Sequence, residues 1–216
     1  MDYTADMGAY WNARFADEGL VWGERASRTA EYALDLFRRE RVKRVLVPGA
    51  GYGRNSRLFS SAGFEVTGVE ISEEAVRLAG AFDPVTRFYH ASVLDIPVED
   101  CVYDAVYCFN VLHLFRQVER TLLIEKCRNV LADSGLVFFT VFSEAEESFG
   151  TGTQIEPNTF ESKPGRPVHY FTEQDLTTHF QGFRVVETGR MEDPEDHGGK
   201  PHVHVLRYIC ARKEVV

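Results

Sequence analysis

The hydrophobic positions between residues 26 and 142 follow two alternating periods, one typical of strands and one typical of helices. Short apolar runs rich in β-branched residues are each followed by a segment in which apolar residues recur every three or four positions. The predicted strands cover 45–48, 64–70, 86–89, 103–110 and 135–142, and the predicted helices cover 26–40, 55–62, 72–79 and 118–131. This alternation predicts a parallel sheet with right-handed crossovers and helices on both faces.

The last third of the chain departs from this pattern. Glycines and prolines break the periodicity of residues 143–170, so we expect a long irregular segment that serves as a substrate lid at the edge of the sheet. A helix is predicted over 172–180. Apolar runs at 183–188 and 204–211 then predict an antiparallel pair of strands, joined by the polar segment 189–201.

The composition is that of a soluble globular protein, with 44% hydrophobic and 26% charged residues in a chain of 216. We expect one domain over residues 1–216, in which residues 1–42 form an N-terminal cap segment and the first helix. The net charge of −9 opposes binding to phosphate backbones, so a nucleic-acid partner is not expected. The chain has no apolar run of the roughly 18 to 20 residues of a membrane span, and its first residues are unlike a signal peptide. We therefore expect a cytoplasmic protein without a membrane partner, either a monomer or a homodimer.

The most informative stretch is the loop that follows the first predicted strand. Gly49, Gly51 and Gly53 let the backbone approach a ligand where a side chain would collide. Glu70 closes the next strand about 20 residues later, where a carboxylate is placed to accept the two hydroxyls of a ribose. The third glycine of a dinucleotide-binding loop is absent, since Arg54 occupies that position. The pattern predicts a nucleoside-containing ligand rather than a pyrophosphate; the alternative is a packing turn with a solvent-facing glutamate.

These residues resemble the class I, Rossmann-like S-adenosylmethionine-dependent methyltransferases, whose Gly-x-Gly-x-Gly loop wraps the methionine and ribose of the cofactor. Within that family, Gly53-Arg54-Asn55 is similar to the tellurite-resistance methyltransferases, and Pro48-Gly49 and Gly68–Ser72 are similar to the thiopurine methyltransferases. The segments Tyr10–Phe15 and Val21–Glu24 resemble the lead-in of both groups. The resemblance implies a three-layer α/β fold with a seven-stranded, mostly parallel sheet and an antiparallel last strand. It also implies S-adenosylmethionine as cofactor and a small-molecule methyl acceptor.

The positions that match the family's cofactor site lie mostly at the carboxyl ends of the predicted strands, where parallel sheets bind ligands. They are Trp22, Gly49, Ala50, Gly51, Tyr52, Gly53, Asn55, Glu70, Ile71, Ser92, Val93, Leu94, Asn110 and Val111. Many members of the family have an acid where Pro48 and Ser92 stand here. Proline at position 48 is shared with thiopurine-type relatives, and Asp95 is either a substitute for the second acid or an exposed loop carboxylate.

The acceptor is expected to contact side chains from four different segments. These candidates are Tyr10, Trp11, Arg14, His113, Tyr170, His202 and His204. His113 and His169 are the candidate catalytic bases, because an imidazole of near-neutral pKa takes a proton from a hydroxyl or an amine. Soft sulfur, selenium or tellurium acceptors that are already ionised need no base, which leaves alignment alone as the alternative mechanism. The N-terminal aromatic rings either contact the sulfonium cation or cap a helix layer.

The remaining candidates for chemistry are histidines and cysteines. His169, His197, His202 and His204 raise the question of a metal, but His-x-His without a carboxylate or cysteine at a defined spacing is a weak pattern. We therefore predict no metal and read these histidines as an exposed hairpin or a cluster at the substrate entrance. The four cysteines are scattered without a C-x-x-C pair and are predicted to be reduced core residues.

Two other functions fit the same cofactor residues. A regulator that binds S-adenosylmethionine without catalysis would differ only in the acceptor pocket. An NAD- or FAD-dependent oxidoreductase would also use the glycine loop and Glu70, although the third fingerprint glycine is missing.

Overall fold

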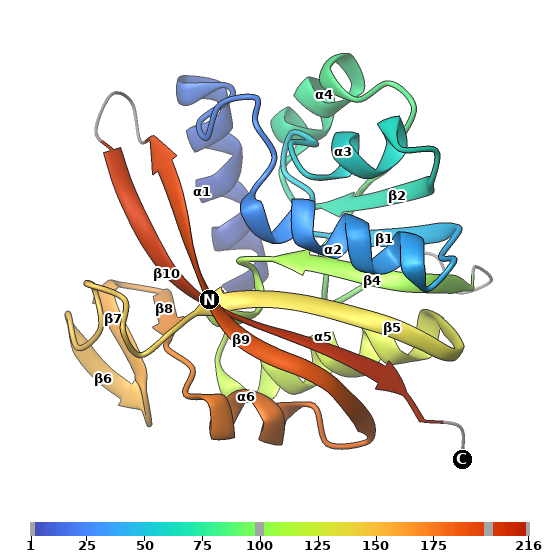
Figure 1. The fold of residues 1–216 in the computed structure, drawn as a ribbon. Helices are drawn as coiled ribbons and strands as arrows, with labels where there is room; N and C mark the ends of the chain where they lie inside the picture. Colours follow the sequence, from blue (N-terminus) through green and yellow to red (C-terminus); the bar gives the residue numbers. More distant parts are fainter. Residues whose placement is uncertain (1–2, 98–101, 197–200, 215–216) are drawn as a thin grey trace.

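The computed structural model describes residues 3–97, 102–196 and 201–214. A central sheet of seven strands runs in the order β3-β2-β1-β4-β5-β10-β9 (Figure 1). Its strands are β1 Arg44–Pro48, β2 Glu65–Glu70, β3 Arg87–His90, β4 Tyr103–Phe109, β5 Leu131–Phe142, β9 Phe183–Asp196 and β10 Pro201–Lys213. Strands β1 to β5 pair in parallel, whereas β10 is antiparallel to both β5 and β9. The predicted mostly parallel sheet with an antiparallel last strand is confirmed.

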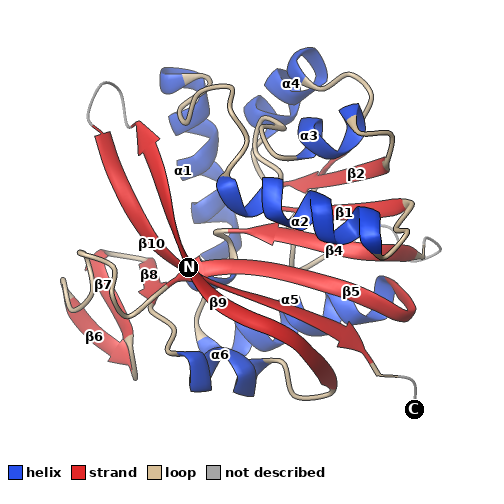
Figure 2. Ribbon diagram, viewed as in Figure 1, coloured by secondary structure: helices blue, strands red, loops and turns tan. Residues whose placement is uncertain are grey.

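Helices cover both faces of this sheet (Figure 2). They are α1 Tyr3–Glu18, α2 Arg28–Arg39, α3 Ser56–Ser61, α4 Glu73–Phe82, the short 3-10 helix η1 Leu112–Leu114, α5 Gln117–Val130 and α6 Glu173–His179. Val45 and Val47 of β1 pack in the core under α2 and α3, whereas Leu46 packs in the core under α5 and α6. This burial on both sides explains why the central strands read as continuous apolar runs.

The predicted helix starts agree with the capping observed. Ser27 and Ser72 are the N-cap residues of α2 and α4, and their side chains accept hydrogen bonds from the backbone N–H groups of Ala30 and Ala75. The cap at Ser72 immediately follows the end of β2 at Glu70. Capping therefore fixes where α4 leaves the carboxyl end of β2, next to the predicted ribose carboxylate.

The prediction of an irregular segment over residues 143–170 is wrong. Strands β6 Thr153–Glu156, β7 Thr159–Lys163 and β8 Arg166–His169 form a separate three-stranded antiparallel sheet. The turn between β6 and β7 contains Asn158 and the turn between β7 and β8 contains Gly165, and both residues have a positive φ angle. Pro167 lies in β8, an edge strand, where a missing N–H is tolerated. These glycine, proline and asparagine residues therefore lie in the turns or in the edge strand of this sheet and do not prevent short strands from forming.

The polar segment 189–201, predicted to be a connector, instead extends the two last strands. Strand β9 continues to Asp196 and β10 begins at Pro201, and the two stay paired beyond the point where β5 ends opposite Leu206. We call this extension, residues 189–196 and 201–205, the ribbon; Figure 1 shows it projecting from the sheet beside α1. Its strands are held by backbone hydrogen bonds, which polar sequences form as readily as apolar ones.

Three cysteines, Cys108, Cys127 and Cys210, are buried free thiols, as predicted. Cys101 and His197 lie outside the described residues. None of the described helices combines the length and the apolar character that a membrane span requires.

Candidate active site

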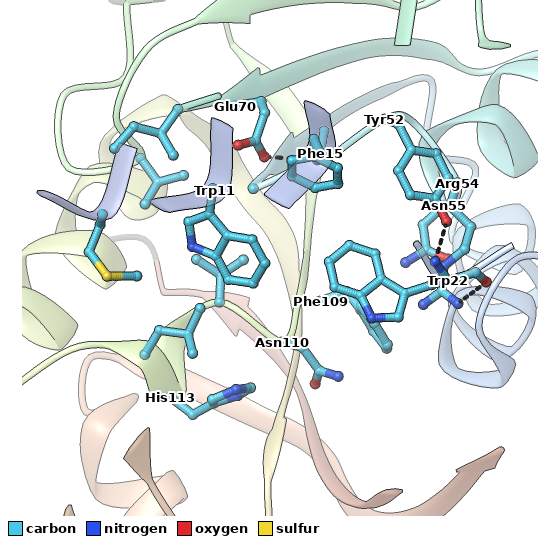
Figure 3. A pocket seen from close by; sticks show the side chains of 18 of the residues that line it. Trp11, Phe15, Trp22, Tyr52, Arg54, Asn55, Glu70, Phe109, Asn110 and His113 are labelled. Carbon is cyan, nitrogen blue, oxygen red and sulfur yellow. Dashed lines mark hydrogen bonds between the residues drawn. The ribbon is translucent and has the colours of Figure 1, made fainter. Parts of the chain in front are cut away.

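A cavity of about 330 Å³ lies at the carboxyl ends of β1, β2 and β4. This is the size of a small-molecule site. Figure 3 shows Glu70 at one end of the cavity and His113 at the other, with Trp11 and Trp22 between them. The lining comes from α1, the loops after β1, β2, β3 and β4, the end of β5 and the ribbon.

The glycine loop is folded for close packing. Gly49 has a φ of 68°, and a Cβ added there would collide with the side chain of Val111. Only glycine combines this backbone conformation with such a close approach. The loop is also tied to the start of α2, because Asn55 Oδ1 accepts a 2.9 Å hydrogen bond from the N–H of Ser27.

Glu70 is buried and held in one orientation. Its carboxylate accepts hydrogen bonds from the N–H groups of Gly51 and Ser72, both at 2.9 Å. Burial raises the pKa of Glu70, and the N–H donors oppose that rise by stabilising the charged form. The carboxylate also lines the cavity. It therefore presents a fixed set of acceptor oxygens to a ligand beside the glycine loop.

An aromatic wall covers one side of the cavity. The rings of Trp11 and Trp22 have centroids 6.1 Å apart, and Trp22 stacks on Tyr52 at 6.2 Å. The hydroxyl of Tyr52 donates to Gly23 O at 2.6 Å and accepts from Trp22 N at 3.2 Å. Burial raises the pKa of Tyr52 to about 12, so the phenol stays protonated. The guanidinium of Arg14 stacks on both tryptophan rings, at 5.6 and 5.4 Å, so these ring faces already bind a cation.

A buried ion pair joins the glycine loop to the ribbon. Arg54 Nη2 lies 2.6 Å from Glu195 Oε1, and Arg54 Nη1 donates a hydrogen bond to Trp22 O at 3.2 Å. Both side chains line the cavity. Sequence reasoning missed this role for Arg54 and missed Glu195 entirely, since the two residues are separated by 141 positions and Glu195 stands in a polar segment.

Asn110 follows β4 with a φ of 54°, an uncommon conformation outside glycine. Among the described residues, its Oδ1 is one of the few buried side-chain nitrogen or oxygen atoms that have no hydrogen-bond partner. Asn110 lines the cavity. Because an unpaired buried acceptor is costly, this oxygen is suited to accept a hydrogen bond from a ligand.

His113 lies at the far end of the cavity from Glu70. Its ring stacks on Phe142 with centroids 4.0 Å apart, and its Nδ1 accepts a hydrogen bond from the N–H of Phe142 at 3.4 Å. Burial, reinforced by His204 and His169, lowers the pKa of His113 to about 3. The imidazole is therefore neutral near pH 7 and is a weak base.

Most of the predicted cofactor residues line the cavity. They are Trp22, Gly49, Ala50, Gly51, Tyr52, Asn55, Glu70, Ile71, Ser92, Val93, Asn110 and Val111. The lining does not include Gly53 or Leu94, and Asp95 is exposed. A Cβ added at Gly53 would lie 3.2 Å from Asp83, Phe88 and Ser56, so the backbone is closely packed there.

The predicted acceptor residues divide into two groups. Trp11, Arg14, His113 and His204 line the cavity, whereas Tyr10, Tyr170 and His202 do not. The ring of Tyr10 instead lies under the guanidinium of Arg166, at 4.1 Å, and the hydroxyl of Tyr170 donates to Ser148 O at 3.0 Å.

His169, the second candidate base, lies away from the cavity. It is buried between Thr159 Oγ1 at 2.8 Å and Asp175 Oδ2 at 2.6 Å, and burial lowers its pKa. The segment 143–170, all of it described, contributes nothing to the cavity lining. The physical reason is that these residues fold on one another as the small sheet.

Sequence reasoning did not select several lining residues. They are Met7, Phe15, Arg54, Phe109, Leu114, Phe115, Phe142 and Glu195. Phe109, Leu114 and Phe115 adjoin the predicted positions Asn110, Val111 and His113, so the strand-end rule applied more broadly would have found them. No sequence signal marked Glu195.

Comparison with known proteins shows which proteins this chain is similar to. A model described as a methyltransferase domain matches residues 46–139, which contain the glycine loop, Glu70 and Asn110. Residues 46–139 are therefore similar to a methyltransferase domain. A probable S-adenosylmethionine-dependent methyltransferase of Mycobacterium tuberculosis is 29% identical to it over 114 residues, which cover 52% of this chain and 40% of the relative. The ubiquinone biosynthesis O-methyltransferase of Bordetella avium is 28% identical over 116 residues, covering 50% of this chain and 46% of that protein.

The chain has the fold of solved methyltransferases over nearly its whole length. The crystal structure of 1,6-didemethyltoxoflavin-N1-methyltransferase from Burkholderia thailandensis, with S-adenosylhomocysteine bound, superposes with a TM-score of 0.74 at 22% identity. The match covers 99% of this chain and 90% of the other. The chain spans less than half the length of either curated relative named above. The closer likeness to tellurite-resistance and thiopurine methyltransferases stays a prediction.

Proposed function

We propose that this protein binds S-adenosylmethionine in the cavity and transfers its methyl group to a small-molecule acceptor. The observation that carries the proposal is the buried carboxylate of Glu70, fixed by the N–H groups of Gly51 and Ser72 at the end of β2. A carboxylate in this position accepts both ribose hydroxyls. Bound S-adenosylmethionine would supply a methyl carbon made electrophilic by a positively charged sulfur.

The residues at the cavity fit this cofactor in three ways. Glu70 offers oxygens to the ribose, and the loop after β3 offers Ser92 and Val93 to the adenine. The unpartnered Oδ1 of Asn110 offers an acceptor to an N–H of the cofactor. Trp11 and Trp22 line the cavity and offer aromatic surface to the methionine part of the cofactor, beside the guanidinium of Arg14 that stacks on both rings. The remaining contacts are largely apolar and exclude water.

The far end of the cavity is the proposed acceptor site. His113, Phe142 and His204 line this end and form one stack, with ring centroids 4.0 Å and 4.9 Å apart. Aromatic surfaces of this kind favour a small, flat or polarisable acceptor. The small sheet β6–β8 is retained as the proposed lid, since Arg166 at its edge stacks on Tyr10 of α1.

The low pKa of His113 supports a mechanism in which alignment matters more than proton removal. A base with a pKa of about 3 removes little of the proton from a hydroxyl or amine at neutral pH. Acceptors that are already anionic, such as thiolates, selenolates and related tellurium compounds, need only in-line placement against the methyl carbon. We therefore propose soft sulfur, selenium or tellurium nucleophiles as the acceptor class.

A panel assay tests this function. The protein and S-adenosylmethionine are incubated with small thiols, selenite, tellurite, phenols and amines, and release of S-adenosylhomocysteine is measured. We expect turnover with a thiol or with a selenium or tellurium compound, and we expect slower turnover in a Trp11→Ala variant. Binding of S-adenosylhomocysteine without turnover of any compound would favour a non-catalytic regulator instead.

A further inference from the structure

A second cluster of polar side chains lies where the ribbon meets the cavity. It consists of Glu146, which follows β5, and of His202 and His204, which share one face of β10 because residues two apart on a strand point the same way. Glu146 Oε1 lies 2.6 Å from His204 Nδ1 and 3.4 Å from His202 Nε2. The candidate ligand atoms of the three side chains all lie within 4.8 Å of one another. The carboxylate that the His-x-His pattern lacks in the sequence is therefore supplied by the fold.

Neighbouring groups hold this cluster in a ligand-like orientation. The second oxygen of Glu146 accepts a hydrogen bond from the N–H of Val205 at 2.7 Å, which directs the first oxygen toward both histidines. His204 Nε2 lies 3.6 Å from a carboxylate oxygen of Glu195. A histidine with one ring nitrogen near a carboxylate and the other facing a carboxylate and a second histidine has the arrangement found at metal sites.

Another group of similar composition shows the contrast. His169, Asp175 and His179 also come together, but the guanidinium of Arg120 donates to His179 Nε2 at 3.1 Å. Arg120 is buried and also pairs with Glu156 at 3.4 Å, and its hydrogen bond to His179 occupies a nitrogen that a metal ion would need. In the Glu146 cluster, the arginine that reaches the same network, Arg54, is paired with Glu195 at 2.6 Å. The two clusters therefore differ in that an arginine donates directly to a candidate ligand atom at His179, whereas Arg54 pairs with Glu195, which is outside the Glu146 cluster.

We propose that Glu146, His202 and His204 bind a divalent transition-metal ion, with Zn²⁺ as the best match. Two imidazoles and one carboxylate form a three-ligand set that leaves a coordination position open. Since His204 also lines the cavity, this metal site borders the proposed acceptor site.

The consequence for chemistry rests on the proposed methyltransferase function. A thiol or hydroxyl bound to the metal would release its proton to solvent more readily, as metal-bound water does. The acceptor's lone pair would then attack the methyl carbon, and the carbon–sulfur bond of the donor would break with its electrons left on sulfur. The metal would supply the acceptor activation that His113, with its low pKa, does not.

Cobalt titration of the full chain, stripped of metal with a chelator, tests this site. We expect one equivalent of Co²⁺ to bind with visible d–d absorption, and Zn²⁺ to displace it. Glu146→Gln and His202→Gln should each weaken binding by at least ~10-fold, the loss expected even for groups that only support a ligand. The matched control, His179→Gln in the other cluster, should bind like the wild type.

Three outcomes would overturn the site: no stoichiometric binding to the wild-type chain, equal affinity in all variants, or loss in the His179→Gln control alone. In Glu146→Gln the new side-chain amide oxygen can still accept from the N–H of Val205, and His202 is a third exposed, so at least one variant should keep the native fold. Titration of the same variants with S-adenosylhomocysteine distinguishes failure of the metal site from failure of the proposed methyltransferase function. Cofactor binding should persist when metal binding is lost.

Discussion

At the residue scale, Glu70 carries the largest share of the proposed cofactor recognition. Its two backbone hydrogen bonds place the oxygens before a ligand arrives, so little ordering is needed on binding. Glu70→Gln replaces one acceptor oxygen by an NH2 group that opposes either the N–H of Gly51 or a ribose hydroxyl. We expect ~10- to 100-fold weaker binding of S-adenosylhomocysteine, the cost of losing a hydrogen bond to a charged group.

Calorimetric titration measures this effect, and Glu65→Gln is the matched control. Glu65 stands at the exposed start of the same strand and should bind like the wild type. Equal affinities for both variants would show that Glu70 is a structural carboxylate only.

The low pKa of His113 predicts how the stability of the protein changes at acid pH. Its pKa is lowered from 6.5 to about 3 in the folded chain, so below pH 6.5 the unfolded state binds a proton that the folded state does not. The stabilising contribution of neutral His113 is thus complete above pH 6.5 and is lost as the pH falls toward 3, by ~1.4 kcal/mol per pH unit. His113→Gln should make the decline of stability between pH 6.5 and about pH 4 shallower.

Urea unfolding at several pH values measures this slope, and His90→Gln, at an exposed position, is the control. An unchanged slope in His113→Gln would mean that the imidazole of His113 titrates normally in the folded protein.

At the element scale, α1 is the part of the fold that closes the cavity. Met7, Trp11, Arg14 and Phe15 project from it into the lining, while the sheet is formed entirely by later residues. Removal of residues 1–19 should therefore weaken S-adenosylhomocysteine binding by at least ~100-fold, as expected when several apolar and cation–π contacts are lost together. Near-UV and far-UV circular dichroism of the truncated chain should still show a folded sheet. Intact affinity would contradict a role for α1 in binding.

Strand and helix periodicity predicted β1 to β5, α2 to α6 and the cofactor side of the cavity, because burial on both faces of a parallel sheet marks the sequence directly. The ribbon could not be predicted in this way. Its polar residues face partners that are remote in sequence, such as Arg54 for Glu195, and a buried polar residue has the same local pattern as an exposed one. For the same reason the sequence did not predict that the carboxylate of Glu146 lies beside His202 and His204, since Glu146 precedes His202 by 56 positions. The strands β6–β8 were missed because turn residues outnumber apolar ones there.

At the scale of the whole molecule, the two ends of the chain meet at one cavity. Helix α1 comes from the beginning of the chain and the ribbon from its end, and Arg28 of α2 donates its backbone N–H to Asp193 at 3.3 Å. We therefore propose that residues 1–216 form one cooperative domain. A ligand bound at this junction should stabilise the whole chain, by ~2.7 kcal/mol at a concentration about 100 times its Kd.

Both the proposed function and the proposed activation of the acceptor by a metal require that the cavity beside the glycine loop binds S-adenosylmethionine. The most direct test is calorimetric titration of the purified chain with S-adenosylhomocysteine, NAD and FAD in parallel. We predict one S-adenosylhomocysteine site per chain and no measurable heat of binding for NAD or FAD. Tight binding of NAD or FAD with none of S-adenosylhomocysteine would contradict the account.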